Sequence, residues 1–430
     1  MSRPSSVAER FIMRERVRAN ETQWGSFAKR AQDLVTAGKT ADSDEWKKLR
    51  AEMNEFRPNP PLSVGPYKID TGSISASQLT MVKNPGGLAS DKVQFDRLVI
   101  YQGETPEVTP LVLAGDIDYA THGFPPATEK AFIDQGLRII RAPLFTGPAL
   151  LMHWDKAAAF RDVRLRQAVA HAVNRDENGR ISLGDSGKAH TSMTGMSDNL
   201  VPQWMSQADQ ARLNKYEFNL EKAETLMRDA GYARGSDGVW AKDGQKLEFE
   251  LTFPAEFADW SASAQHLSES LTKFGIRIEP RGVQNIQHPV DVNEGRFQLA
   301  YRNWGTASPH PQFSYIEDLK VRNTDQPQGG MKYPLKQETS SGAIDFDELI
   351  TRSGEGFDDA AQKAAVSKMA VAFNELLPIV PMFERYGNNP VLEGKRVTGW
   401  LPPEHPIYKN PHSVDNFVIM MIMDGTLKPA

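Results

Sequence analysis

The sequence contains no cysteine. This absence excludes disulfide bonds, thiolate zinc sites, iron–sulfur clusters and cysteine nucleophiles, because each of them needs a thiol. Long apolar stretches are also missing. The longest purely apolar run, from Phe417 to Met423, has seven residues, whereas a membrane-spanning helix needs about 20. Residues 1–19 have no apolar segment of the export-signal type, so we expect neither a membrane span nor an export signal in this chain.

An excess of positive charge is absent as well. The chain has 50 Lys and Arg residues against 55 Asp and Glu residues, which gives a formal net charge of −5. Proteins that bind nucleic acid or anionic membrane surfaces usually carry a clear excess of basic residues. We therefore expect no nucleic-acid partner and no direct attachment to a membrane.

Residues suited to catalysis occur, but not in the patterns that catalysis needs. Residues 184–187 spell the Gly-Asp-Ser-Gly tetrapeptide of trypsin-like proteases, yet they lie among α/β segments and not in a disulfide-rich β domain. Lys188 follows Gly187 as in a phosphate-binding loop, but Ala189 replaces the hydroxyl residue that binds the metal. The nine histidines include no pair spaced around a glutamate as zinc ligands. We expect no catalytic residue, no metal and no cofactor, and hence not an enzyme.

The composition changes after the first sixty residues. Residues 1–60 are strongly polar and predict two helices, around 15–35 and 44–56, which a cluster of three prolines at 58, 60 and 61 brings to an end. From there strands and helices alternate at the spacing of crossover units. The pattern predicts strands over 93–100, 117–120, 137–140 and 149–154, and helices over 105–115 and 126–135.

The middle of the chain predicts helices with clear ends. Asp162 is a good cap for a helix whose apolar stripe continues to Val173, and Asn219 caps another that ends at Gly231. A strand over 247–253 and a helix over 260–274 follow, then a strand at 276–278, a long helix over 366–377 and a strand over 379–383. At 430 residues, two or three domains are expected. The fold class indicated is α/β, with a sheet covered by helices.

The helix motif from Phe160 to Arg175 closely resembles one in the family 5 extracellular solute-binding proteins of ABC importers, which bind oligopeptides, dipeptides or nickel. Further motifs follow in the order that the family has them, over residues 62–390: Gly65 to Tyr67, Gly115 to Asp118, Asn219 to Tyr232, Leu271 to Ile276 and Gly295 to Trp304. The resemblance implies a type II periplasmic-binding-protein-like fold, with two α/β lobes joined by two crossovers. By analogy the crossovers are expected near 118–123 and 381–386. The expected domains are a polar helical segment (1–60), a first lobe (61–120 with 386–430) and a second lobe (121–385).

The first lobe is expected to be incomplete. Members of the family begin with an export signal and have well over a hundred residues before the Gly-Pro-Tyr strand, whereas this chain has 64. Two explanations stay open: a fragment of a longer gene product, which we favour, and a shortened paralogue.

Binding residues follow from the resemblance only where motifs match. The segment from Tyr301 to Pro311 stands where the family lines its cleft, and Trp304 stands where an aromatic residue packs against ligand. The alternative for Trp304 is an ordinary core tryptophan. Ligand-binding candidates are Tyr301, Asn303, Trp304, Thr306, Ser308, and His122, Arg385 and Tyr386 beside the crossovers. Arg164 and Arg166, although typical of the family, are expected to be structural.

The function implied is non-catalytic capture of a small extended solute, a peptide or a similar polar molecule, outside the cytoplasmic membrane for delivery to an ABC permease. A hydrolase or sensor that reuses the clamp, and a nonfunctional truncated paralogue, are the alternatives. Peptide-binding relatives pair the free α-amino group of the ligand with an aspartate three residues after the tryptophan; here that position is Ala307. Because no carboxylate stands between Tyr301 and Ser314, we expect a ligand that is not held by a free amino terminus.

Overall fold

The computed structural model describes residues 23–41, 43–121, 123–324, 329–409 and 416–430. Contacts divide the chain into two compact units. The first comprises the residues up to Gly103 with Gly394–Trp400 and Val418–Ala430, and the second comprises Glu104–Glu393 with Leu401–Phe417. The lobe boundaries expected from the family, at residues 60, 120 and 385, describe a different division and stay a prediction. No helix in the described ranges combines the length and the apolar character that crossing a membrane requires.

The first unit joins a helical pair to a small sheet. One helix covers residues 23–36, and α2 (Asp44–Glu55) begins at Ser43, whose hydroxyl accepts from the Trp46 amide. The helix expected over 44–56 is thereby confirmed. The antiparallel sheet consists of β1 (Tyr67–Asp70), β2 (Gln78–Lys83) and β3 (Arg97–Tyr101). The strand expected over 93–100 is confirmed only in part, because the chain pairs with β2 from Arg97 onward. The unit also contains α15 (Asn416–Met423) from Val418 onward and the short pair β18 (Val397–Thr398) and β19 (Lys428–Pro429).

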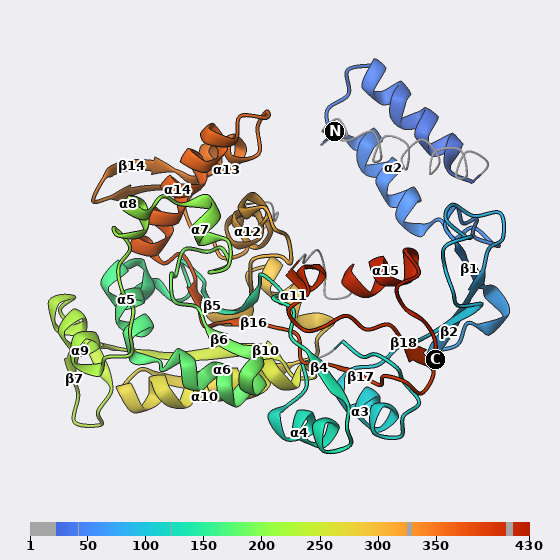
Figure 1. Cartoon of the computed structure of the whole chain (residues 1–430). Helices are drawn as coiled ribbons and strands as arrows, with labels where there is room; N and C mark the ends of the chain where they lie inside the picture. Colours follow the sequence, from blue (N-terminus) through green and yellow to red (C-terminus); the bar gives the residue numbers. More distant parts are fainter. Residues whose placement is uncertain (1–22, 42, 122, 325–328, 410–415) are drawn as a thin grey trace. The chain divides into compact units, whose positions relative to one another are not determined.

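The second unit is built on a five-stranded mixed sheet (Figure 1). Its strand order is β11 (Arg277–Val283), β10 (Glu248–Pro254), β12 (Leu299–Trp304), β5 (Gly147–Met152) and β15 (Val380–Pro381). The first three strands are parallel, and β5 runs antiparallel to both of its neighbours. Every residue of β5 is buried. A strand with both faces buried lies in the middle of a layered structure.

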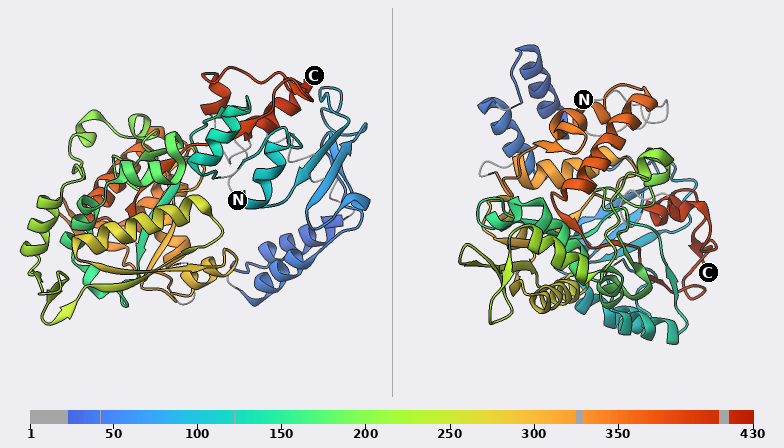
Figure 2. Two further views of the ribbon diagram at one scale, coloured as in Figure 1. Left: turned by 90° about the horizontal axis from the view of Figure 1, so that it is seen from below. Right: turned by 90° about the vertical axis from the view of Figure 1, so that its left-hand side faces the viewer.

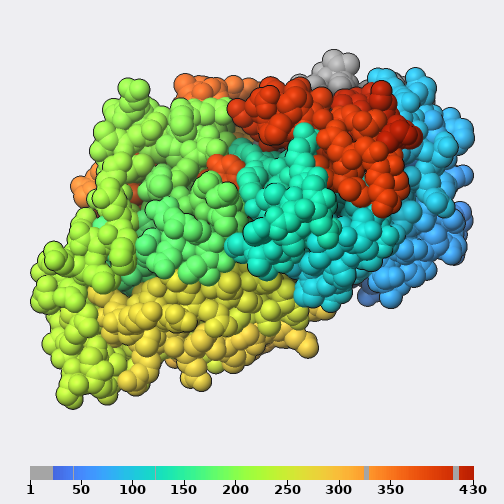
Figure 3. Space-filling view, turned by 60° about the horizontal axis from the view of Figure 1, so that its bottom comes forward, coloured from blue at the N-terminus to red at the C-terminus, as the bar shows by residue number. Residues whose placement is uncertain are grey.

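Helices cover both faces of this sheet, as the alternation along β5 requires. Leu150 and Met152 pack into one core, with α5 (Val163–Ala172), α6 (Arg175–Leu183), α9 (Leu220–Asp229) and α10 (Ala258–Phe274). Ala149 and Leu151 pack into the other, with α7 (Val201–Trp204), α12 (Pro311–Ile316), α13 (Phe346–Ser353) and α14 (Asp359–Leu376). In the left-hand view of Figure 2, α10 (yellow) lies along the strands. The surfaces of α6 (green) and α10 (yellow) adjoin in Figure 3. The expected helix-covered α/β sheet is confirmed.

The helix ends form where the sequence indicates them. The Asp162 carboxylate accepts from the Arg164 amide at 3.0 Å, and the Asn219 side chain accepts from the Lys222 amide at 2.9 Å. Gly231 and Gly275 have φ of 87° and 97°, the left-handed backbone that glycine adopts without a steric penalty. Asn219 and Gly231 thus bound α9, while Asp162 starts α5 and Gly275 ends α10.

Arg164 and Arg166, in the helix motif from Phe160 to Arg175, have the structural role expected of them. Arg166 is 2% exposed and donates to the carbonyls of Leu376, Phe160 and Arg161. Arg164 pairs with Asp162 and donates to the Asp229 carbonyl.

A smaller α/β region combines elements from before and after the five-stranded sheet in the chain. It consists of α3 (Thr105–Leu113), α4 (Pro126–Asp134), β4 (Arg138–Ile140) and β17 (Asn389–Val391). The strand expected over 117–120 is wrong: only Tyr119 forms an isolated bridge, with Val391. The helices expected over 105–115 and 126–135 and the strand over 137–140 are confirmed within two residues at either end.

Two antiparallel segments connect this region to the five-stranded sheet, and we call them the linking ribbon. They cover residues 142–148 and 382–387, and are joined by backbone hydrogen bonds from Leu144 to Arg385, from Arg385 to Thr146, from Met382 to Pro148 and from Gly387 to Ala142. The second crossover expected from the family, near 381–386, lies in this ribbon. Residues 118–120 of the first, placed near 118–123, bond to β17 and its flanks; both crossovers stay predictions.

Candidate ligand-binding site

The linking ribbon brings charged side chains together at one edge of the sheet. Its strand β16 (Phe383–Arg385) pairs with β6 (Gly187–Ala189). Arg385 Nη2 lies 3.2 Å from Asp259 Oδ2 at the start of α10, and Asp259 is 4% exposed. Burial raises the pKa of Asp259, and the charge of Arg385 opposes that rise. A Cβ on Gly123 would lie 2.5 Å from the Asp259 carboxyl carbon, so only glycine fits this close approach to the ion pair.

Glu384 and Tyr386, on either side of Arg385, have a different set of hydrogen-bond partners. Glu384 is 2% exposed and accepts from the Ser197 hydroxyl, the Asp198 amide at 3.1 Å and the Asn199 side-chain amide at 2.8 Å. Burial raises the pKa of Glu384 to about 7 in spite of these donors, and the Asp198 charge adds to the rise. The Tyr386 hydroxyl, half-buried, lies 2.9 Å from the Asn199 side-chain nitrogen. The loop at 197–199 therefore holds this stretch of the ribbon.

The aromatic candidates of the segment from Tyr301 to Pro311 are buried. Trp304 is 0% exposed, its indole nitrogen donates to the Phe383 carbonyl at 3.1 Å, and its ring meets His190 edge-on with centroids 4.4 Å apart. Tyr301 is also 0% exposed, with its hydroxyl against Ser263 and Asn178. In this structure Trp304 is therefore a core tryptophan, the alternative stated above. Contact of the Trp304 or Tyr301 ring with a ligand stays a prediction.

The polar candidates keep their places at the end of β12. Asn303 is half-buried and donates to the Gly305 carbonyl at 2.9 Å and to Glu317 at 3.1 Å. The Thr306 hydroxyl is buried and has no hydrogen-bond partner among the described residues. Ser308 is 8% exposed and accepts from the His310 amide. Of the other candidates, Arg385 and Tyr386 are in the ribbon, and His122 lies outside the described residues.

Two carboxylates that sequence reasoning missed lie beside this segment. They belong to the helical segment η4 (Glu317–Thr324). Asp318 accepts from the Gly305 amide at 2.8 Å, and burial raises its pKa well above the usual range. Glu317 pairs with Arg322. Both follow the stretch from Tyr301 to Ser314, in which the sequence has no carboxylate. No local pattern in the sequence indicates that the chain after Ser314 folds back against Gly305. Burial disfavours the charged form of Asp318, and Glu317 is paired with Arg322, so neither is well placed to receive an ammonium group.

The residues that a catalytic interpretation would use have structural partners. The Ser186 hydroxyl is 0% exposed and donates to the Gly387 carbonyl at 2.9 Å, and Arg141 donates to it in turn. It therefore ties the turn before β6 to the linking ribbon. Within the described ranges, no three His, Asp or Glu side chains are grouped so that they could hold a metal ion.

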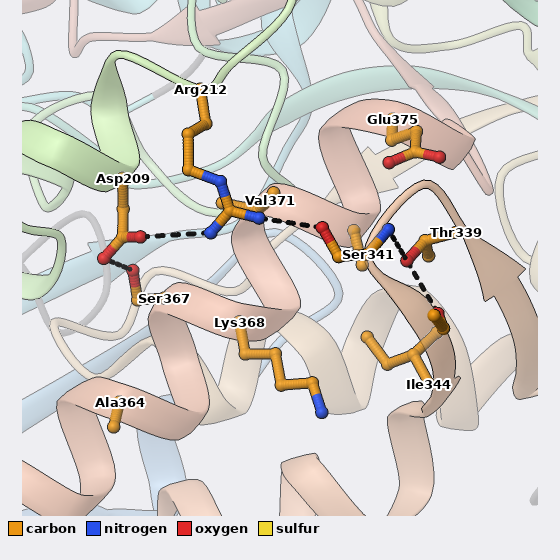
Figure 4. A pocket seen from close by; sticks show the side chains of 12 residues that line it. Asp209, Arg212, Thr339, Ser341, Ile344, Ala364, Ser367, Lys368, Val371 and Glu375 are labelled. Carbon is orange, nitrogen blue, oxygen red and sulfur yellow. Dashed lines mark hydrogen bonds and ion pairs between the residues drawn. The ribbon is translucent and has the colours of Figure 1, made fainter.

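A separate hollow of about 220 Å³ lies between α8 (Gln207–Gln210), the hairpin β13–β14 (Lys336–Thr339 and Gly342–Asp345) and α14. Its charged groups largely satisfy one another: Arg212 lies 3.4 Å from Asp209 and donates to Ser341 at 2.9 Å, and Ser367 donates to Asp209 (Figure 4). None of the residues predicted from the sequence lines it.

Comparison with known proteins identifies the architecture. Residues 21–326 match the model of bacterial extracellular solute-binding proteins, family 5. The chain belongs to this family. The α/β fold expected from the motifs is thereby confirmed, and so is the resemblance on which it rested.

Family 5 relatives are similar over parts of their length. A probable ABC transporter-binding protein of Deinococcus radiodurans is 32% identical over 126 residues, 29% of this chain and 20% of that protein. A putative ABC transporter peptide-binding protein of Brucella ovis is 23% identical over 262 residues, 60% of this chain and 44% of that protein. The chain thus spans less than half the length of these curated relatives.

Solved structures show the same fold. An oligopeptide-binding protein of an ABC transporter from Thermotoga maritima superposes with a TM-score of 0.69 at 17% identity, covering 92% of this chain and 73% of that one. NikZ from Campylobacter jejuni, in complex with Ni(L-His), gives a TM-score of 0.66 at 19% identity, covering 84% and 68%. The oligopeptide-binding protein AppA from Bacillus subtilis, with a nonapeptide, gives 0.64 at 17%, covering 91% and 70%.

Proposed function

We propose that this chain captures a small extended solute, a peptide or a similar polar molecule, outside the cytoplasmic membrane and delivers it to the permease of an ABC importer. Membership of family 5 supports this proposal. The Brucella relative is named a peptide-binding protein, and AppA holds a nonapeptide. The chain binds its ligand and performs no chemistry on it.

The ligand site that we propose lies where the linking ribbon meets the end of β12. Arg385 and Tyr386 come from the ribbon, and Asn303, Thr306 and Ser308 from the segment after β12. These residues offer hydroxyl, amide and guanidinium groups, as polar ligands require. Two features support the location: the buried Thr306 hydroxyl without a partner and the half-buried side chains of Arg385 and Tyr386. Tyr301, Trp304 and His122 complete the proposed set.

Native mass spectrometry of protein purified without denaturation tests capture directly. We expect a mass increment from a bound small molecule, which is lost after unfolding and refolding and restored by adding a mixture of short peptides. Isothermal calorimetry with the same peptides measures the affinity. No increment, and no heat from any peptide, would contradict the proposal.

A pair of matched variants locates the site. Tyr386→Phe removes a hydroxyl in the ribbon, whereas Tyr408→Phe removes one that donates to the Leu401 carbonyl, outside the proposed site. We expect Tyr386→Phe to weaken binding by about 0.5–1.5 kcal/mol, the value of one hydrogen bond, and Tyr408→Phe to leave it unchanged. Equal effects of the two variants would place the site elsewhere.

A further inference from the structure

Arg302 differs from every other arginine of the second unit that is not exposed. Those at 138, 141, 164, 166, 175, 322 and 385 each bond to a carbonyl, a hydroxyl or a carboxylate. Arg302 is half-buried, its Nε is buried without a hydrogen-bond partner, and none of its nitrogens forms a hydrogen bond or ion pair with a described residue. Among the arginines of the second unit that are not exposed, Arg302 is therefore the one for which the described residues supply no acceptor.

The surroundings of Arg302 make this isolation costly. Its guanidinium carbon lies 5.6 Å from the centre of the Trp260 ring, an attraction that replaces only part of the lost hydration. Burial, together with the nearby positive charge of Arg322, lowers the pKa of Arg302 to about 9. The negative charge of Glu317 opposes this shift but is the weakest of the three effects. Arg322 itself is paired with Glu317 and bonded to Asn303. A cation kept in such a place without a partner is less stable than an apolar side chain of the same size.

A second unpartnered donor lies next to it. The Trp260 indole nitrogen is buried, and Trp260 is 6% exposed, yet this N–H has no acceptor among the described residues. Tryptophan has a donor and no acceptor, so what is missing beside both side chains is an acceptor. Arginine presents its N–H groups as a planar fork that matches the two oxygens of a carboxylate.

We propose that Arg302 binds a carboxylate of the ligand, with the Trp260 indole beside it. This inference rests on the proposed function and adds the chemical class of the ligand: a solute that carries at least one carboxylate. In a peptide this group is either the C-terminal carboxylate or an acidic side chain. Arg302 stands on β12 two residues before Trp304, within the segment that carries Asn303 and Thr306, so the carboxylate binds beside the polar groups of the proposed site.

Three peptide libraries distinguish the two sources. They consist of random tri- to hexapeptides without Asp or Glu as free acids, the same peptides as C-terminal amides, and amides that include Asp and Glu. Native mass spectrometry measures how much of each the protein retains. Retention of the acids over the amides identifies the C-terminus, and retention of only the acidic amides identifies a side chain. Equal retention of all three would overturn the inference while the proposed function stood, whereas retention of none would refute the proposed function itself.

Variants assign the effect to Arg302. Arg302→Gln should reduce retention of the carboxylate-bearing library about tenfold or more, and Arg302→Lys by less, since lysine keeps the charge but loses the fork. The control is Arg281→Gln, which removes an exposed arginine paired with Glu250 and should leave retention unchanged. Binding that is insensitive to Arg302→Gln would overturn the inference.

The stability of the ligand-free protein supplies a readout that a purely structural arginine would not give. Removing a structural arginine exposes its former partners and lowers the melting temperature. Because Arg302 has no hydrogen-bond or ion-pair partner to lose among the described residues, and only its contact with the Trp260 ring, Arg302→Gln should leave the melting temperature of ligand-free protein nearly unchanged or raise it. The variant should also abolish the stabilisation that the carboxylate ligand gives to the native protein. A lower melting temperature without ligand would show that Arg302 serves the fold.

Discussion

Replacing Trp304 by alanine separates the two roles that this residue can have. In the family the position belongs to an aromatic residue that packs against ligand, whereas in this structure the ring has no exposed surface. It lies in the core formed with α14 and edge-on against His190. We therefore expect Trp304→Ala to act first on stability.

The expected size of the effect follows from burial. Truncating a fully buried tryptophan to alanine costs about 3–5 kcal/mol, because apolar contacts are lost and a cavity remains. The Phe383 carbonyl also loses its donor at 3.1 Å, which adds about 1 kcal/mol. Trp304→Phe keeps most of the contacts and loses the same hydrogen bond, so its cost should be about half as large.

Thermal unfolding of the two variants and the parent protein, followed by circular dichroism, measures this order. Peptide affinity is then measured at a temperature where each variant is folded. If Trp304→Ala melts with the parent protein but fails to bind peptide, the core argument is refuted and the indole is a ligand contact. If both variants melt lower, in the order given, and bind normally once folded, its role is structural.

Three further predictions concern charge. Because the pKa of Glu384 is raised in the folded protein, the stabilisation by its protonated carboxyl is fully present below about pH 4.5 and is lost as the pH rises through about 7, on the order of 3 kcal/mol. Glu384→Gln should therefore flatten this part of the curve of unfolding free energy against pH, measured by urea unfolding. An unchanged slope in the variant would refute this assignment. Arg166→Met should lower the free energy of unfolding by about 3–5 kcal/mol, because three carbonyls lose their donor. Arg164→Met removes a half-exposed ion pair and should cost about 1 kcal/mol or less. Equal losses for the two variants in calorimetric unfolding would contradict this contrast. Acetylating the amino terminus of a bound peptide should leave its affinity unchanged in calorimetry, since Ala307 offers no carboxylate, and loss of binding on acetylation would show that an amine is recognised.

Local signals in the sequence were sufficient for most helices. Asp162 and Asn219 cap the starts of α5 and α9, and Gly231 and Gly275 end α9 and α10. Capping and glycine termination can be predicted from sequence because they involve residues within one turn of each other. The stretch at 117–120 shows the limit of such signals. Its apolar residues fit a strand, but the strand that it meets is β17, some 270 residues away, and the β-pairing with β17 is a single bridge at Tyr119. Composition alone does not determine how far a pairing extends.

The same limit applies to the site. The segment from Tyr301 to Pro311 was located by its motif, and the ribbon residues Arg385 and Tyr386 lie where the second crossover was expected. The motif at 115–118 ends well before the first segment of the ribbon begins at 142, so it gave no indication of that segment. The sequence shows that residue 302 is an arginine, but not that it lacks a hydrogen-bond acceptor. Whether an acceptor lies near its guanidinium group depends on which side chains the other helices and strands place there.

The alternation along β16 has a consequence for folding. Glu384 contacts a set of donors at 197–199, and Arg385 contacts the Asp259 carboxylate on the other side. Sliding the strand by one residue would exchange the two sides. Glu384 would then meet the Asp259 carboxylate, which repels it, and Arg385 would lose its partner Asp259. The backbone N–H of Asp198 would lose its acceptor, so every form of the ribbon that is offset by one residue gives up the contacts on both sides. The order of two adjacent side chains thus acts as a check on alignment, and exchanging them, as Glu384→Arg with Arg385→Glu, would favour the wrong pairing over the right one.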